Sequence, residues 1–404
     1  MKYIVILGDG MADEPLEALG GKTPLEVANT PAMDALAGKS ELGMAHTIPE
    51  GMSPGSDTAN LAVMGYDPKI YYTGRSPLEA LSIGVPMKDT DVALRCNLVT
   101  LSEKEEYEAK TIIDHSSGEI STEDAKVLIE AVKKELENEI YHFYPGTSYR
   151  HLTIWDKGSV IEMTPPHDIL GSVISDYLPK QETLREMMKR SYAILNEHPL
   201  NMERAKRGLN KANSIWFWGA GTKPALDRFE ERFGKKGVMV SAVDLLKGIG
   251  AGADMKNLIV EGADGTLHTN YRGKAMAAVD ALLKDGYDFA YIHVEAPDEM
   301  GHQGSIERKI QAIEFLDHEV VRTVVDELGK AGEDFRLLLM PDHPTPIRLR
   351  THTANPVPYL LYDSTKERKA VGAYNEKEAA LTENVEEKGY LLMNKLLGGS
   401  HVNS

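Results

Sequence analysis

The sequence contains almost no cysteine and no long apolar run. Cys96 is the only cysteine among 404 residues, which excludes an intramolecular disulfide and makes a reducing cytoplasm the expected location. A membrane-spanning helix needs about 18 or more consecutive apolar residues, and no such stretch occurs. The short apolar run from Met1 to Leu7 lacks the length and cleavage pattern of a signal peptide.

Positive charge is also scarce. The chain has 45 Lys and Arg against 62 Asp and Glu, a formal net charge of −17. An acidic surface repels nucleic acid and anionic membranes, so neither is an expected partner. A small phosphorylated substrate stays compatible with this balance, because bound metal ions can reverse the local sign of charge. No pattern in the sequence indicates an oligomeric state.

The length and the order of elements predict two domains. A typical domain holds about 100–200 residues, and this chain is longer than that. Continuous apolar segments alternate with helical patterns, which is typical of α/β folds with a mostly parallel sheet covered by helices on both faces. The expected buried strands are Lys2–Leu7, Ser214–Trp218, Gly237–Val243, Phe289–Val294 and Arg336–Met340.

The middle of the chain has a different composition. Residues 88–208 are more charged and more alternating, so we expect a smaller α+β domain inserted into a domain made of residues 1–87 and 209–404. Within the insert, residues 151–163 are predicted to form a β-hairpin. At the other end of the chain, residues 398–404 are expected to be frayed.

Residues able to bind metal follow three of the predicted strands. Asp9 follows the first strand, Asp298 and His302 follow the fourth, and Asp342 with His343 follows the fifth. Ligands of open α/β sheets bind beyond the carboxyl ends of the strands, so these side chains are expected to converge. The four-residue spacing of Asp298 and His302 places both on one face of a helical turn.

The donor set favours two divalent ions. Three Asp and three His suit Mn²⁺, Zn²⁺ or Mg²⁺ better than a soft thiolate metal. They are too many for one catalytic ion, and they fit two ions about 3.5–4 Å apart. Single members have simpler explanations, since Asp9 could cap a helix and His352 could be a solvated loop residue. The candidates are Asp9, Asp298, His302, Asp342, His343 and His352.

Ser56 is a candidate nucleophile. It lies at a glycine-containing turn before a helical pattern, where free backbone N–H groups create positive potential. Two nearby cations would lower the pKa of its hydroxyl and activate it. The simpler alternative is that Ser56 only caps the helix. His293, inside a predicted strand, is interpreted as a core histidine or one that supports a ligand.

Seven motifs stand out, namely Gly8–Gly10, Gly20–Pro24, Pro54–Ala59, Tyr72–Arg75, Arg95–Asn97, His293–Asp298 and Pro341–His343. Together they resemble the archaeal-type cofactor-independent (2,3-bisphosphoglycerate-independent) phosphoglycerate mutases of the alkaline phosphatase superfamily. This resemblance extends through almost the whole chain. It implies an alkaline-phosphatase-like domain, an inserted domain that acts as a lid, and an isomerase of glycolysis that interconverts 3-phosphoglycerate and 2-phosphoglycerate.

The resemblance also implies a role for each candidate residue. Ser56 would carry the phosphoryl group as a phosphoserine intermediate between two divalent ions, for which Mn²⁺ is the first choice and Zn²⁺ or Mg²⁺ are alternatives. One ion would be held by Asp298, His302 and His352, and the other by Asp9, Asp342, His343 and the Ser56 oxygen.

Outside the metal site, the resemblance implies three substrate contacts. Lys247 would contact the phosphate, and Arg150 and Arg204 of the inserted domain would hold the organic part of the substrate.

One segment departs from the family pattern. The family carries an arginine-rich stretch soon after the Arg95–Asn97 motif, whereas this chain has Asp114–Ile120 there. Arginine is the natural bidentate partner of a carboxylate, so the contact with the phosphoglycerate carboxylate is open. His115 is a candidate general acid or base for the acceptor hydroxyl. The departure leaves three alternatives, namely a homoserine kinase-like phosphotransferase, a metal-dependent phosphatase and a metal-binding regulatory protein.

Overall fold

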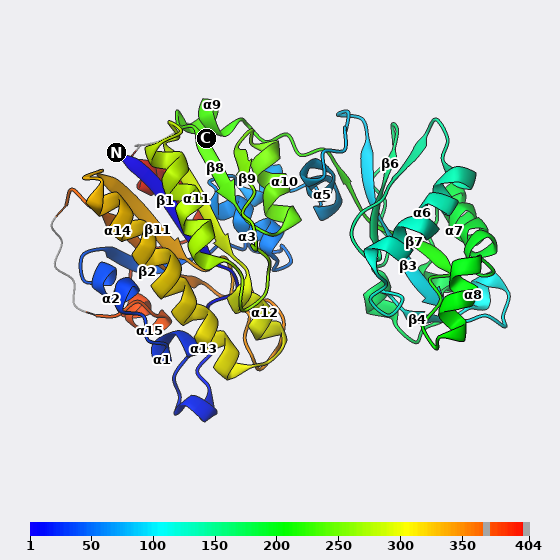
Figure 1. The fold of residues 1–404 in the computed structure, drawn as a ribbon, viewed down its shortest axis with the longest axis horizontal. Helices are drawn as coiled ribbons and strands as arrows, with labels where there is room; N and C mark the ends of the chain where they lie inside the picture. Colours follow the sequence, from blue (N-terminus) through cyan, green and yellow to red (C-terminus); the bar gives the residue numbers. More distant parts are fainter. Residues whose placement is uncertain (367–371, 399–404) are drawn as a thin grey trace. The chain divides into compact units, whose positions relative to one another are not determined.

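The chain folds into two compact units (Figure 1). The computed structural model describes residues 1–366 and 372–398, so the expected frayed end, 398–404, lies outside the described residues except for Gly398. The larger unit consists of Met1–Tyr72 and Ala225–Ser404, and the smaller unit is Thr73–Pro224. The smaller unit thus extends beyond the expected insert at both ends. It includes α5 (Arg75–Ser82), which packs against two strands of that unit.

The larger unit is built on a mixed eight-stranded sheet, in which β9, β8, β10, β1 and β11 run parallel to one another. β12 pairs antiparallel with β11, and β2 pairs antiparallel with β12. The predicted mostly parallel α/β sheet is therefore confirmed. In spatial order the strands are β13 (Val385–Glu386), β2 (Glu41–Ala45), β12 (Val357–Asp363), β11 (Phe335–Met340), β1 (Lys2–Gly8), β10 (Phe289–Val294), β8 (Gly237–Val240) and β9 (Lys256–Leu258).

Helices cover both faces of this sheet. One face, which includes Ile4, Ile292 and Leu337, packs in a single apolar core against α1, α2, α11, α13 and α14. On the other face, α10 packs against β8 and α16 packs against β11. The helices of this unit are α1 (Pro24–Val27), α2 (Pro31–Ala37), α3 (Ser56–Val63), α4 (Pro68–Tyr71), α9 (Phe229–Phe233), α10 (Asp244–Gly252), α11 (Tyr271–Leu283), α12 (Ala296–His302), α13 (Ile306–Phe315), α14 (Arg322–Lys330), α15 (Glu376–Leu381) and α16 (Leu392–Leu397).

The smaller unit is an antiparallel sheet with helices on it, as expected for an α+β domain. Apolar residues of α6 and α7, such as Leu128 and Met188, share one core with Leu94 and Trp216 of the sheet. The strands are β3 (Val92–Leu101), β4 (Ile112–Asp114), β5 (Tyr141–Tyr144), β6 (Arg150–Trp155) and β7 (Ser214–Thr222), and the longer helices are α6 (Thr122–Leu136), α7 (Glu182–Leu195) and α8 (Pro199–Lys206).

Two expectations for this region are wrong. The apolar segment Ser214–Trp218 belongs to β7, which pairs antiparallel with β3 of the smaller sheet and is not part of the parallel sheet. The predicted hairpin over residues 151–163 does not form, because both edges of β6 are already paired, one with β3 and the other with β5. Val160 is largely exposed in the irregular segment that follows.

The two ends of the smaller unit meet. The hydroxyl of Thr73, its first residue, donates a hydrogen bond to the carbonyl of Thr222 over 2.7 Å. Thr222 is the last residue of β7, two positions before the end of the unit. The chain therefore enters and leaves this unit at one place. None of the helices in the described part of the chain has the length and apolar character needed to cross a membrane.

Candidate metal centre

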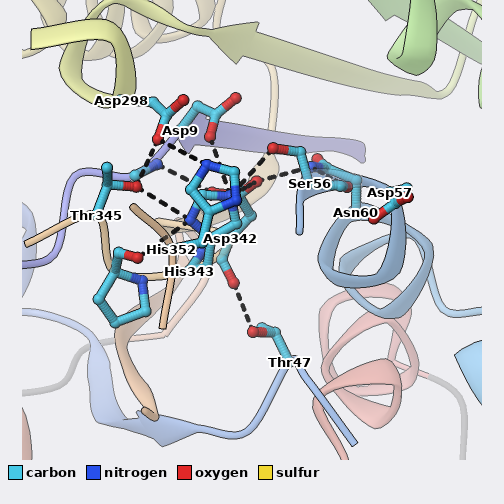
Figure 2. Close-up of polar contacts among 12 residues, drawn as sticks. Asp9, Thr47, Ser56, Asp57, Asn60, Asp298, Asp342, His343, Thr345 and His352 are labelled. Atoms are coloured by element: carbon cyan, nitrogen blue, oxygen red, sulfur yellow. Dashed lines mark hydrogen bonds and ion pairs between the residues drawn. The ribbon is translucent and has the colours of Figure 1, made fainter. Parts of the chain in front are cut away.

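Three neighbouring parallel strands bring carboxylates to one edge of the larger sheet (Figure 2). β1 lies between β11 and β10, with Leu7 level with Met340 on one side and with His293 on the other. Asp9 follows β1, Asp342 follows β11, and Asp298 lies in α12, directly after β10. The structure thus brings together the three strand ends at which the sequence predicts metal-binding side chains.

The side chains at this edge form two overlapping groups of possible metal ligands. In the first group, the ligand atoms of Asp9, Asp342 and His343 all lie within 4.8 Å of one another. In the second group, those of Asp298, His343 and His352 do so. His343 belongs to both groups, so two ions bound here would be close neighbours.

The electrostatics of the first group fit a bound cation. Burial raises the pKa of Asp9 well above its usual range, and the nearby carboxylates of Asp342 and Asp298 raise it further. Its Oδ1 atom is buried and accepts no hydrogen bond from any described residue. A divalent cation would supply both the missing partner for this oxygen and the missing positive charge.

The helix after β10 adds His302 to the second group. Asp298 and His302 are one helical turn apart on α12, and His302 Nε2 lies 3.2 Å from Asp298 Oδ2. The predicted helical turn is therefore present. The hydrogen bond to Asp298 raises the pKa of His302 to about 9. His302 Nε2 also lies 3.0 Å from His352 Nε2, so at most one of these two nitrogens carries a proton.

A glycine and a threonine allow these groups to approach closely. Gly10 has φ +59°, and an added Cβ would overlap the carboxylate of Asp298 and the hydroxyl of Thr345. Gly10 therefore has two reasons to be glycine, one conformational and one steric. Its amide donates to Asp342 Oδ1 over 3.0 Å, and the Thr345 hydroxyl donates to Asp298 Oδ1.

Ser56 points at the same histidine that the two ligand groups share. It is the first residue of α3, whose N-cap is Gly55, and its Oγ lies 3.0 Å from His343 Nε2. Neither residue gives α3 a side-chain cap. The alternative in which Ser56 only caps the helix is therefore wrong, and its hydroxyl is free to face the centre beside the helix N-terminus.

Comparison with known proteins agrees with this geometry. A family model for 2,3-bisphosphoglycerate-independent phosphoglycerate mutase matches residues 37–201. A probable mutase of this kind from Geobacter sulfurreducens is 48% identical over 404 residues, covering 98% of this chain and 100% of the relative. A mutase of the same name from Methanosarcina barkeri is 48% identical over 94% of this chain and 95% of the relative.

The chain belongs to the 2,3-bisphosphoglycerate-independent phosphoglycerate mutase family. The family resemblance inferred from the sequence motifs is thus confirmed.

Solved structures share the whole architecture of this family member. A protein from Pyrococcus horikoshii is similar with a TM-score of 0.82 and 28% identity, over 100% of both chains. The cofactor-independent phosphoglycerate mutase from Thermoplasma acidophilum is similar with a TM-score of 0.65 and 26% identity, over 98% of this chain and 99% of the other.

A buried lysine holds two of the loops of the centre together. Lys309 of α13 is fully buried and donates to the carbonyl of Ala12, after β1, and to the carbonyl of Thr345, after β11. Its ammonium also pairs with Asp13 over 2.8 Å, with both side chains excluded from solvent. The sequence pattern did not reveal this residue, because on α13 it occupies a position like any other lysine.

Lys247, the predicted phosphate contact, lies on α10. Its ammonium pairs with Asp244 of the same helix over 3.2 Å. The role of Lys247 at a phosphate therefore stays a prediction.

The other predicted substrate residues lie in the smaller unit. Arg150 stacks on the ring of Tyr149, with 4.5 Å from the guanidinium carbon to the ring centre. The ring of His115 meets the same tyrosine edge-on at 5.8 Å. Arg150 is exposed and His115 is half-buried, so both remain open to a ligand.

Arg204 differs, because its guanidinium is buried and already bound. It donates to the carbonyls of Asn210 and Ser117 and pairs with Asp124 over 2.9 Å. These bonds hold parts of the smaller unit together. A substrate contact by Arg204 stays a prediction, and it would require these bonds to break.

We expect the substitution Lys309→Met to lower the free energy of unfolding by about 3–5 kcal/mol, because it leaves the buried carboxylate of Asp13 without its partner. Urea denaturation of the metal-free protein measures this. Lys330→Met is the matched control, since Lys330 forms an exposed pair with Glu327, and it should leave stability nearly unchanged. Equal effects of the two substitutions would contradict the structural role of Lys309.

Proposed function

We propose that this chain is an isomerase that interconverts 3-phosphoglycerate and 2-phosphoglycerate without a bisphosphoglycerate cofactor. The observation that carries the proposal is the position of Ser56 Oγ, 3.0 Å from the histidine that two potential metal-ligand groups share. Relatives 48% identical over nearly the full chain are named as mutases of this kind, which supports it.

The proposed centre holds two divalent ions. Asp298, His302 and His352 would bind one, and Asp9, Asp342 and His343 would bind the other together with the Ser56 oxygen. Mn²⁺ is the first choice, with Zn²⁺ or Mg²⁺ as alternatives, because all three accept carboxylate and imidazole ligands. Such ions, when bound, neutralise charge on phosphoryl oxygens and lower the pKa of a nearby hydroxyl.

Ser56 is the proposed nucleophile. Its Oγ gives up a proton and bonds to phosphorus as the bond from phosphorus to one substrate oxygen breaks, and that oxygen takes up a proton to become a hydroxyl. The phosphoryl group then returns from Ser56 to the other hydroxyl of the same glycerate. This division makes two easier steps out of one difficult transfer. The N-terminus of α3, where Gly55 provides no side-chain cap, favours negative charge on the phosphoryl group.

The smaller unit, Thr73–Pro224, is proposed to supply substrate contacts. Arg150 and His115 are its candidates, since both lie against Tyr149 and neither is fully buried. A cation and an imidazole on one aromatic ring suit the carboxylate and the hydroxyl of a glycerate.

We expect the purified Mn²⁺-loaded protein to convert 3-phosphoglycerate to 2-phosphoglycerate without added bisphosphoglycerate. A coupled assay with enolase follows the product. Parallel reactions test ATP-dependent phosphorylation of homoserine and release of inorganic phosphate. Phosphorylated homoserine as the main product would identify the kinase-like alternative, and phosphate release without isomerisation would identify a phosphatase.

Ser56→Ala should lower kcat at least about 10³-fold, because it removes the proposed acceptor of the phosphoryl group. The thermal unfolding midpoint should change little, since the Ser56 side chain is only half-buried. Ser53→Ala is the control, because Ser53 is exposed three residues earlier in the same segment. Full activity of the Ser56 variant would exclude the covalent route.

Asp342→Asn should reduce the Mn²⁺ retained after dialysis, as measured by elemental analysis, because it removes the charge of a ligand while conserving its shape. Asp363→Asn is the control at a carboxylate that pairs with Arg336 over 2.9 Å and belongs to neither ligand group. Unchanged metal content in the Asp342 variant would refute the ligand assignment.

A further inference from the structure

Two polar side chains interrupt the otherwise apolar strand β10. Tyr291 and His293 are both fully buried, in a strand whose sequence is FAYIHV. They are two residues apart, so they lie on the same face of the sheet. Burying polar groups in a central strand is costly unless each finds a partner. The hydrogen bonds of both side chains lead to the metal centre.

His293 contacts Asp9 directly. Its Nε2 lies 2.8 Å from Asp9 Oδ2, and its Nδ1 lies 3.1 Å from the hydroxyl of Ser241, just beyond β8. The Ser241 hydroxyl accepts a hydrogen bond from the amide of Val243, so its own proton is available for Nδ1. A carboxylate that binds metal can only accept, so the Nε2 proton points at Asp9. The partners of His293 therefore fit a ring that donates from Nε2 to Asp9.

Tyr291 reaches Asp342 through one intermediate side chain. Its hydroxyl donates to Asn60 Oδ1 over 2.6 Å. The amide nitrogen of Asn60 then donates to Asp342 Oδ2 over 2.8 Å and to the carbonyl of Ser56 over 2.8 Å. Asn60 is fully buried on α3, one helical turn after the proposed nucleophile.

The orientation of the Asn60 amide follows from its partners. Its NH₂ group faces a carboxylate and a carbonyl, which only accept, and its oxygen faces the hydroxyl of Tyr291. A flipped amide would lose the bonds to Asp342 and to the carbonyl of Ser56, because its oxygen would then face two acceptors. These two acceptors determine which way Asn60 points, and the Tyr291 hydroxyl holds it there by donating to its oxygen. Asn60 in turn ties Asp342 to the first turn of α3.

We propose that β10 is a positioning strand for the metal centre, in which His293 orients Asp9 directly and Tyr291 orients Asp342 through Asn60. This inference rests on the proposed metal centre. Neither residue touches substrate in the proposed reaction, so both are positioning residues. The two chains of hydrogen bonds end on the two carboxylates of one ligand group, Asp9 and Asp342, and on none of the carboxylates of the other.

The test is a calorimetric titration of the metal-free, full-length protein with MnCl₂, which measures the affinity of each Mn²⁺ binding event. Loss of a group that supports a ligand typically weakens metal binding by about 10–100-fold. Tyr291→Phe removes one hydroxyl and should weaken one of two Mn²⁺ binding events about 10-fold. The other event, which we assign to the ion proposed for Asp298, His302 and His352, should change less than about 3-fold.

A pair of substitutions at His293 separates hydrogen bonding from packing. His293→Gln places an amide N–H near the position of Nε2 and should bind Mn²⁺ within about 3-fold of the original chain. His293→Leu removes the donor and should weaken binding by about 10–100-fold. Equal loss in both variants would overturn the proposed role of the Nε2–H donor. If His293→Leu does not fold, the Mn²⁺ affinity of Tyr291→Phe tests whether β10 positions the metal ligands.

Tyr359→Phe is the matched control. Tyr359 is a fully buried tyrosine of β12 in the same sheet, and its hydroxyl bonds to Glu41, outside both ligand groups. It should lower the thermal midpoint of the metal-free protein as much as Tyr291→Phe does, but leave Mn²⁺ affinity unchanged. Equal Mn²⁺ affinity in the two tyrosine variants would overturn the positioning role. An unaltered protein that binds no Mn²⁺ would instead refute the proposed metal centre itself.

Discussion

Mutual repulsion among buried carboxylates is the constraint on which the centre of the larger unit depends. Asp9, Asp298 and Asp342 are each at most 7% exposed, and the carboxylates of Asp342 and Asp298 add to the effect of burial in raising the pKa of Asp9. Such a set stays together only if hydrogen-bond donors and positive charge surround it. The amide of Gly10, the hydroxyl of Thr345 and the imidazole of His293 supply donors, and divalent ions would supply the charge.

The surrounding fold satisfies this constraint from several directions. The parallel strands bring the carboxylates to one edge, and Lys309 joins the loops that follow β1 and β11. Asn60 joins the first turn of α3 to Asp342. Because α3 begins with Ser56, the position of the proposed nucleophile and the position of one proposed ligand are coupled through a single side chain.

Much of the site could be predicted from sequence because its carboxylates follow the ends of apolar strands. Each apolar segment stops where Asp9, Asp298 or Asp342 follows, and parallel strands must place such residues together. Asn60 and Lys309 could not be found in this way. Asn60 lies 282 residues from Asp342 and Lys309 lies 296 residues from Asp13, and only the packing of α3 and α13 defines those contacts. The predicted sheet for β7 was wrong for a related reason, since an apolar run does not indicate which of two sheets it will join.

The hydrogen bond between Thr73 and Thr222 has a consequence for modularity. A unit whose entry and exit are adjacent can be acquired, lost or exchanged without disturbing the topology of its host, because a short connection would close the gap. The larger sheet draws none of its strands from within Thr73–Pro224. In evolutionary terms, the smaller unit is a module that can be replaced while the larger unit, with the proposed metal centre, is inherited unchanged.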